Sequence, residues 1–161
     1  MIKVKRDTIT KARAAAWKEF SRFIRLRDCL FTTGNLEYGR CVTCGKVLEF
    51  SRLQAGHFIP GRNNSILFDV RCVHAQCVGC NVYGGGQQPS YYWYMVEKYG
   101  KETIDSLFRQ ANCSLKLTAP DLREMAARFR RWSKHIEQNG IVPAEDIEPY
   151  MVELRSRIGM R

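Results

Sequence analysis

Four of the seven cysteines form two Cys-x-x-Cys pairs, and this pattern limits the folds open to the chain more than any other feature. The pairs, Cys41 with Cys44 and Cys77 with Cys80, are separated by 32 residues. A two-residue gap lets both sulfurs of one turn reach the same ion at about 2.3 Å, and two such turns complete the tetrahedron that zinc prefers. A catalytic dithiol needs only one pair, whereas four thiolates leave no open position for chemistry. The spacing therefore predicts a structural Zn²⁺ site.

The cysteine count and the N-terminal segment indicate the compartment in which the protein works. The number of cysteines is odd, and the N-terminal segment lacks the apolar stretch of a secretory signal. Both observations argue against a disulfide framework. No run of the sequence approaches the roughly 18 apolar residues of a membrane-spanning helix. The sequence therefore predicts a cytoplasmic protein that has no membrane segment.

The charge of the chain is strongly and unevenly basic, with a formal net charge of +10. Residues 1–27 carry nine Lys or Arg against two acidic residues. A second basic cluster consists of Arg128, Arg130, Arg131 and Lys134. Two separate basic segments suit a polyphosphate partner, because each neutralised phosphate releases condensed counterions. The pattern favours nucleic-acid binding over an anionic membrane, and over a solvated surface with no partner.

Hydrophobic spacing predicts helices towards both ends of the chain and short strands around the cysteines. Thr10 is the expected N-cap of the first helix, and Thr118 caps the longest of the later ones. Pro89 and Gly100 are typical of the start and the end of another helix. The expected helices cover residues 10–28, 90–99, 102–110, 118–138 and 149–158, and the expected strands cover residues 47–50, 53–58 and 68–73.

The interval between the cysteine pairs contains the residues that suggest chemistry. His57 lies in a predicted strand, a loop and a return strand follow, and Asn81 comes directly after the last cysteine of the pairs. This order resembles the HNH (ββα-metal) nucleases. In that arrangement the His takes a proton from water, which attacks phosphorus, and a divalent ion held partly by the helix residue stabilises the leaving oxygen. An imidazole suits a base that works near neutral pH, and Mg²⁺ prefers oxygen ligands.

Several segments of the chain also match one protein family in their order and spacing. They are AWKEFSRFIRLRD (16–28), CVTCGK (41–46), QAGHFIPGR (54–62), FDVR and VHAQCVGCNVYGGG (68–86), and YMVEKYG (94–100). On these segments the sequence resembles the bacteriophage NinG (Rap) recombination nucleases, and more distantly the phage endonuclease VII junction resolvases. The resemblance implies a metal-dependent endonuclease that acts on branched recombination intermediates, D-loops and Holliday junctions, inside an infected bacterial host cell.

The resemblance also implies roles for individual residues. It gives His57 the role of general base, Asn81 that of a ligand to a catalytic Mg²⁺ or Mn²⁺ ion, and the four paired cysteines the structural zinc. Many HNH enzymes place an Asp metal ligand directly before the base, where this chain has Gly56. The ligand left unassigned has three candidates: Gln54, Asp69 and His74.

The loop after His57 differs from the family at one further position. The family tends to carry Asn where this chain has Cys72, at a position that braces the loop. Asn63 and Asn64 are candidates to brace the loop instead. Arg62, in the same loop, either clamps a phosphate or faces water.

Each of these residues has a simpler interpretation. His57 is alternatively a surface histidine or a zinc ligand. His74, between Val73 and Ala75, is as compatible with a packed structural histidine as with a metal ligand. Asn81 is alternatively the cap of a helix.

Together these features predict an α+β protein with a zinc-stapled ββα-metal (HNH) core and flanking N- and C-terminal helices. We expect residues 1–161 to form a single domain. Within it, residues 1–38 form a basic helix and a turn-rich connector, residues 39–88 the zinc-bound HNH core, and residues 89–161 the helical C-terminal part.

Two functions fit these features. The first is a structure-selective DNA endonuclease, and the second is a non-catalytic, zinc-held module that binds branched or single-stranded DNA. His57 and Asn81 favour the enzyme, whereas Gly56 favours the module. A protein-interaction zinc domain fits the +10 charge poorly. The expected partners are branched DNA, phage or host recombination proteins, and a second copy of the chain, bound through the helix at 10–28 or at 118–138.

Overall fold

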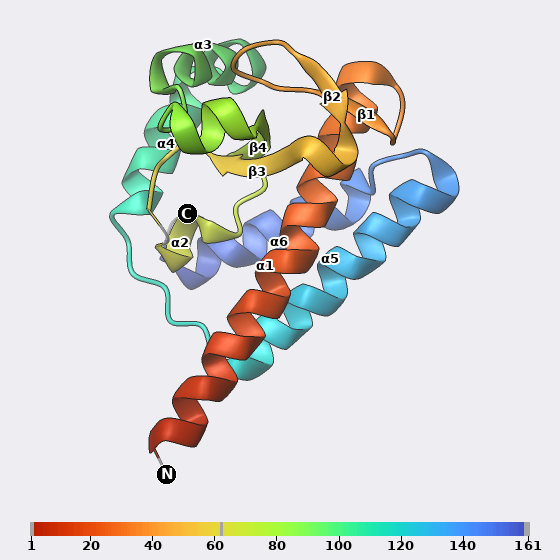
Figure 1. Cartoon of the computed structure of the whole chain (residues 1–161). Helices are drawn as coiled ribbons and strands as arrows, with labels where there is room; N and C mark the ends of the chain where they lie inside the picture. The colour runs from red at the N-terminus through yellow and green to blue at the C-terminus, as the bar shows by residue number, and fades with distance from the viewer. Residues whose placement is uncertain (1, 62, 160–161) are drawn as a thin grey trace.

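The computed structural model describes residues 2–61 and 63–159, with side chains from residue 8 onward. This part of the chain forms helices and two small antiparallel sheets, so the predicted α+β class is confirmed (Figure 1). The α-helices are α1 (Ile2–Thr33), α2 (Asn64–Leu67), α3 (Gln88–Tyr99), α4 (Lys101–Ala111), α5 (Ala119–Asn139) and α6 (Ala144–Arg157). The strands are β1 (Tyr38–Arg40), β2 (Val47–Glu49), β3 (Leu53–His57) and β4 (Val73–Cys77). A 3-10 turn, η1 (Phe50–Arg52), and a π-helical turn, η2 (Gly79–Tyr83), complete the set.

Helices α1 and α5 pack side by side and supply much of the core (Figure 1). The ring of Phe20 lies 4.9 Å from that of Phe129, and Phe23 lies 5.1 Å from Trp132, measured between ring centroids. All four side chains are buried. The apolar faces of the two helices proposed for a homodimer are therefore covered within one chain.

The first helix is longer than predicted, because α1 already includes Ile2 and continues to Thr33. Thr10 is therefore an exposed residue inside the helix, and its prediction as an N-cap is wrong. Residues 2–9 contain no Pro or Gly that would stop the helix. Among the described residues, no helix is long and apolar enough to cross a membrane.

The ends of the later helices follow their capping residues. Thr118 and Asp121 form a reciprocal capping box at the start of α5, and Gly140 ends the helix in the left-handed conformation with φ of 63°. Helix α6 differs from the prediction, since it begins at Ala144 and Pro149 lies inside it. Its first turn carries Glu145 and Asp146, whose negative charge suits the N-terminal end of a helix.

The strands near the cysteines form two antiparallel pairs, β1 with β2 and β3 with β4. In the second pair Leu53 faces Cys77 and His57 faces Val73. The return strand predicted at 68–73 is wrong, because β4 covers Val73–Cys77. The apolar residues Phe68 and Val70 are buried in a turn that follows α2, so their hydrophobicity reflects core packing rather than strand pairing.

Candidate functional site

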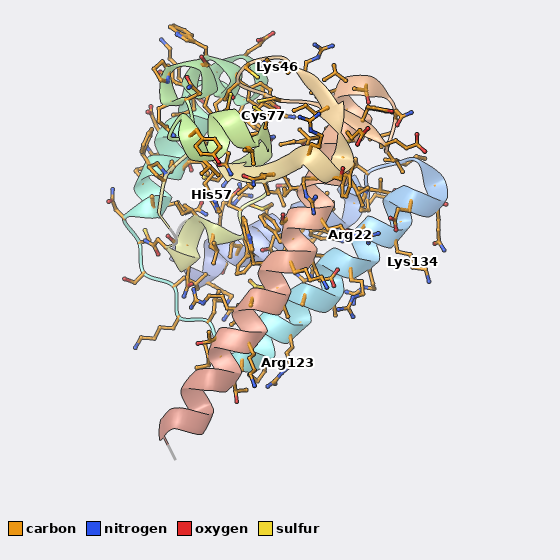
Figure 2. The ribbon with its side chains drawn as sticks, in the orientation of Figure 1. Arg22, Lys46, His57, Cys77, Arg123 and Lys134 are labelled. Carbon is orange, nitrogen blue, oxygen red and sulfur yellow. The ribbon has the colours of Figure 1, made fainter. Side chains whose placement is uncertain are left out.

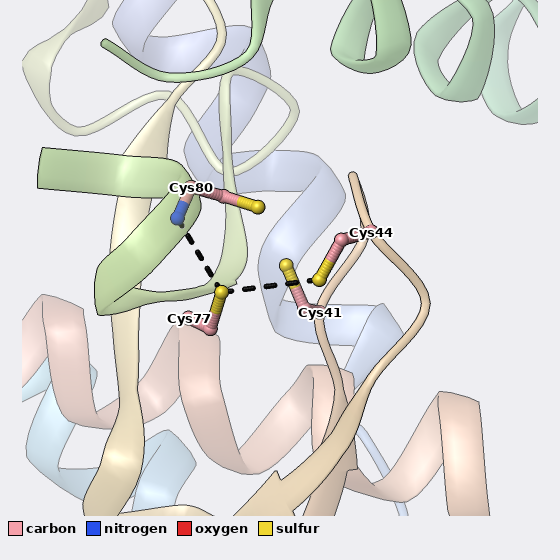
Figure 3. Close-up of side chains that lie close together, drawn as sticks. All are labelled: Cys41, Cys44, Cys77 and Cys80. Carbon is pink, nitrogen blue, oxygen red and sulfur yellow. Dashed lines mark hydrogen bonds between the residues drawn. The ribbon is translucent and has the colours of Figure 1, made fainter. Parts of the chain in front are cut away.

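The four paired cysteines converge on one point, which Figure 3 shows in close-up. Cys41 and Cys44 lie in the turn between β1 and β2, Cys77 ends β4, and Cys80 lies in η2. Their sulfurs all lie within 4.8 Å of one another, and Cys44 and Cys77 are 3.9 Å apart. A tetrahedral zinc ion with Zn–S bonds of about 2.3 Å separates its sulfurs by about 3.8 Å. The four thiols could therefore hold a metal ion such as zinc, as their spacing predicted.

The local backbone explains why the first cysteine pair forms a tight turn. Gly45 has φ of 74°, a conformation that glycine adopts without strain, and its amide donates to the Cys41 carbonyl at 2.9 Å. The Val42 amide donates to the Ala75 carbonyl of β4 at 3.0 Å, which ties the turn to the second pair. Burial raises the pKa of the Cys41 thiol, but hydrogen bonds from Thr43 and from backbone amides lower it to about 6 overall. One sulfur of the cluster is thus readily deprotonated, as a metal ligand must be.

His57 is the last residue of β3 and is held from two sides. Its Nε2 lies 3.2 Å from the Leu67 carbonyl oxygen. Because a carbonyl oxygen only accepts, Nε2 carries a proton, and in the neutral ring the lone pair is then on Nδ1. The ring stacks on Trp17 of α1, with centroids 5.1 Å apart and planes 16° apart. His57 is not part of the four-cysteine cluster, so the structure does not bring it to the predicted zinc ligands.

His57 and Asn81 come together at one pocket of about 280 Å³. The pocket lies beside the four-cysteine cluster, because Asn81 follows Cys80 in η2. The described residues that line it are Trp17, Ala55, His57, Pro60, Gly61, Asn81, Gly85, Gly86 and Gln88. The structure therefore brings a histidine from between the two cysteine pairs and a side-chain amide from directly after the second pair to one opening, next to a group that can hold a metal.

Asn81 is placed by the π-helical turn and not by helix capping. The N-cap residue of η2 is Val78 and that of α3 is Gln87, so the interpretation of Asn81 as a helix cap is wrong. The Asn81 amide nitrogen donates to Gln54 Oε1 at 2.8 Å. Of the three candidates for the unassigned ligand, Gln54 is therefore the one whose side chain contacts Asn81.

The other two candidates lie in buried hydrogen-bond networks. Asp69 accepts from Arg71 at 2.7 Å and from Gln110 at 2.9 Å. His74 is fully buried, with Nδ1 at 3.1 Å from Asp28 and 2.8 Å from Arg27, and Nε2 at 3.2 Å from the Tyr99 hydroxyl. Protein groups contact both ring nitrogens of His74, and neither His74 nor Asp69 is among the described residues that line the pocket.

The burial of His74 predicts a pH dependence of stability. Desolvation lowers the pKa of His74 from 6.5 to about 4, although the Asp28 carboxylate acts in the opposite direction. The unfolded chain then binds this proton at a higher pH than the folded chain does. The free energy of unfolding should be maintained above pH 6.5 and should fall by up to about 3 kcal/mol as the pH drops towards 4.

Denaturant melts of the zinc-loaded protein between pH 7 and 4 measure this effect. His74→Gln should flatten the pH dependence, whereas His135→Gln, at an exposed position on α5, should leave it as in the wild type. Equal slopes for the wild type and His74→Gln would show that His74 is not the group responsible.

The loop between β3 and β4 is held by the two asparagines proposed for that role. Asn63 caps α2 by accepting from the Ser65 amide and donates to the Ala111 carbonyl at 2.6 Å. Asn64 donates to the Leu115 carbonyl at 2.9 Å and accepts from Arg13. These bonds fix α2, and therefore also the Leu67 carbonyl that holds His57.

The predicted DNA-binding residues of α5 differ in whether an acidic side chain pairs with them. Arg128 pairs with Glu124 and Glu153 and is only 20% exposed, and Arg130 pairs with Glu19. Arg131 and Lys134 are exposed. Figure 2 shows Lys134 and His57 on opposite sides of α1. Arg62, the remaining predicted DNA contact, lies outside the described residues.

Sequence reasoning missed three features in and around the pocket. They are the Trp17 ring against His57, the Leu67 carbonyl, and the Gln76 side chain that donates to the Gly86 carbonyl. A backbone carbonyl leaves no trace in the residue type, and Trp17 lies 40 residues before His57 in the sequence. Gln76 could have been found from the alternation of side chains along β4, had that strand been placed correctly.

Comparison with known proteins gives the family. The family model described as bacteriophage lambda NinG protein matches residues 2–139. The chain belongs to the NinG family. This match covers α1, all four strands, η2 and α5, so the cysteine cluster and the pocket both lie in the part shared with the family.

Individual members of the NinG family have low sequence identity to this chain, over part of its length. Protein ninG of Escherichia phage 933W is 26% identical over 100 residues, which is 62% of this chain and 49% of that protein. The corresponding protein of Salmonella phage P22 is 31% identical over 68 residues (42% and 33%), and that of Escherichia phage lambda is 24% identical over 100 residues (62% and 48%). The matched part of this chain spans about half the length of the first of these relatives. No solved protein structure matches this chain.

Proposed function

We propose that this protein is a metal-dependent, structure-selective DNA endonuclease with an HNH-type core, acting on branched recombination intermediates such as D-loops and Holliday junctions. The observation that carries the proposal is the placement of His57. Its Nε2 lies against the Leu67 carbonyl, its ring lies on Trp17, and it shares a pocket with Asn81 beside the four-cysteine cluster.

The proposed chemistry follows from the tautomer of His57. Nδ1 accepts the proton of a water molecule as that water attacks phosphorus, and the Leu67 carbonyl stabilises the imidazolium that forms at Nε2. A bound Mg²⁺ or Mn²⁺ ion would supply charge stabilisation of the leaving oxygen. Asn81 offers an oxygen ligand for such an ion, and the four cysteines would hold a separate structural zinc.

Exposed basic residues suggest how DNA reaches the pocket. Lys11 and Lys18 are exposed on α1, the helix that lies between His57 and Lys134 in Figure 2. Arg131 and Lys134 extend the positive surface on α5. A duplex arm laid across α1 would contact both helices while a strand enters the pocket. Such a path suits DNA with more than one arm.

The basic residues of α5 lead to a prediction on salt dependence. The logarithm of the DNA association constant should fall linearly with the logarithm of salt concentration, by about 0.9 for each phosphate that the protein neutralises. Arg131→Ala with Lys134→Ala should reduce that slope by about 0.9 for each phosphate that the variant no longer neutralises. Fluorescence anisotropy at several salt concentrations measures it. If Lys101→Ala with Arg109→Ala on α4 flattens the slope instead, DNA lies on the other side of the molecule.

Substrate choice is tested by competition. A labelled four-way junction is incubated with the protein and Mg²⁺, in the presence of excess unlabelled linear duplex or excess unlabelled junction. We expect the junction to suppress cleavage at much lower concentration than the duplex does. Equal suppression would remove structure selectivity from the proposal.

Other parts of the proposal depend on the family resemblance. The protein would act in the cytoplasm of an infected bacterium, with phage or host recombination proteins or a second copy of the chain as partners. The alternative function is a non-catalytic module that binds branched or single-stranded DNA through the same basic surface.

A further inference from the structure

The space directly above Gly56 is filled by another side chain. A Cβ atom at Gly56 would lie 1.9 Å from Gln76 Oε1 and 2.8 Å from Gln76 Cδ. His74 of β4 pairs with Gly56 of β3, and Gln76 lies two residues after His74 on β4. Since alternate residues of a strand point to the same face, Gln76 reaches diagonally across to Gly56. Glycine at position 56 is therefore what allows the Gln76 carboxamide to occupy this position.

The orientation of the Gln76 carboxamide is fixed by its surroundings. Its nitrogen donates to the Gly86 carbonyl at 3.0 Å and to the Thr43 hydroxyl at 3.2 Å. A carbonyl accepts only, so the nitrogen must face Gly86 and the oxygen must face Gly56. Gln76 is fully buried, and among the described residues its Oε1 has no hydrogen-bond partner. Buried oxygens almost always have a partner, so this one calls for a ligand.

A second carboxamide oxygen faces the same point. Asn81 Oδ1 lies 2.9 Å from the position of a Gly56 Cβ, and the nitrogen of the same side chain is held by Gln54. Two oxygens, from β4 and from η2, therefore converge above Gly56. Asn81 also lines the pocket of His57. Neutral oxygen ligands of this kind suit Mg²⁺ and Mn²⁺.

We propose that Gln76 and Asn81 together bind a divalent cation beside this pocket, above Gly56, and that Gln76 Oε1 takes the ligand position that an Asp at position 56 has in many HNH enzymes. The catalytic role of this cation rests on the proposed function, but its binding does not. Gln76 is an additional ligand of this chain, and the exchange of Asp for Gly at position 56 is what gives it room.

Binding is tested with Mn²⁺ alone, without DNA. The probe is the electron paramagnetic resonance signal of free Mn²⁺ during titration of the zinc-loaded protein. The wild type should bind one Mn²⁺ ion, and Gln76→Met should weaken binding at least about tenfold, the effect usual when an interaction at a metal site is removed. The matched control is Gln110→Met, because Gln110 is equally buried but both ends of its amide have protein partners. Wild-type affinity in Gln76→Met, or no Mn²⁺ binding by the wild type, would overturn the proposal.

A rescue experiment keeps the test valid if Gln76→Met is poorly folded. Gly56→Asp alone should collide with Gln76, whereas Gly56→Asp combined with Gln76→Ala places a carboxylate in the vacated space. The double variant should bind Mn²⁺ at least as tightly as the wild type, and Gln76→Ala alone should bind weakly. Zinc content and melting temperature confirm folding. Failure of the double variant to regain binding counts against the shared position.

The two proposals fail in different ways. If the wild type binds Mn²⁺ through Gln76 but does not cleave DNA, the proposed cation site stands and the proposed nuclease function is rejected. Cleavage that is unaffected by Gln76→Met would retain the nuclease and remove Gln76 as a ligand, leaving an ordered water molecule as the partner of Oε1.

Discussion

Cys44→Ser is expected to unfold residues 38–86 or to lower their stability severely. Four-thiolate zinc sites contribute roughly 10–16 kcal/mol in apparent binding free energy, whereas a whole domain is stable by about 5–15 kcal/mol. The four cysteines join the β1–β2 turn to β4 and η2, so losing the ion disconnects three elements. Cys44 itself is exposed, and a change at an exposed position otherwise alters stability by about 0.5 kcal/mol or less. A large decrease would therefore report on the metal and not on packing.

The measurement combines zinc content by elemental analysis with thermal melting by circular dichroism. Cys113→Ser is the control, because Cys113 lies after α4 and outside the four-cysteine cluster. It should retain one zinc per chain and the melting temperature of the wild type. A protein that contains no zinc as purified and keeps its fold in a chelator would refute the structural zinc.

His57→Ala is expected to reduce DNA cleavage by roughly 10²–10⁴, the usual contribution of a positioned general base. Zinc content and DNA affinity should stay close to those of the wild type, because His57 is outside the cysteine cluster and its ring is only partly buried. The rate should be measured under single-turnover conditions with saturating protein, so that it reports on chemistry rather than on binding.

His135→Ala provides the matched control, since His135 is an exposed histidine on α5. It should cleave at the wild-type rate. If His57→Ala also cleaves at that rate, His57 is not the base, and its contacts with Leu67 and Trp17 are structural. A loss of zinc or of folding in His57→Ala would instead make the rate uninterpretable, and His57→Gln would then replace it.

The features that the sequence predicted well have strong local signals. Cysteine pairs with a two-residue gap have one common use, and the four sulfurs converge as expected. Thr118 and Gly140 mark the ends of α5 because capping depends on nearby backbone groups. The neighbourhood of His57 and Asn81 was expected from the resemblance to the HNH order of His, loop, return strand and Cys-x-x-Cys-Asn, and both residues line one pocket.

The features that were missed depend on contacts between distant segments. Residues 68–73 and 73–77 are both apolar enough for a strand, and only pairing with β3 selects the second. The correct position of β4 matters, because it places Gln76 on the same face of the β3–β4 sheet as Gly56. The stack of Trp17 on His57 arises from packing of α1 across β3, which no residue pattern near His57 indicates.

Whether the pocket cuts DNA is decided by one measurement. A labelled four-way junction is incubated with the zinc-loaded protein, with Mg²⁺ or Mn²⁺ either added or left out, and the strands are separated on a denaturing gel. A metal-dependent nuclease built on His57 and Asn81 predicts defined strand breaks when either ion is added and none without them. Tight binding of the junction with intact strands under every condition would contradict the nuclease and establish the DNA-binding module in its place.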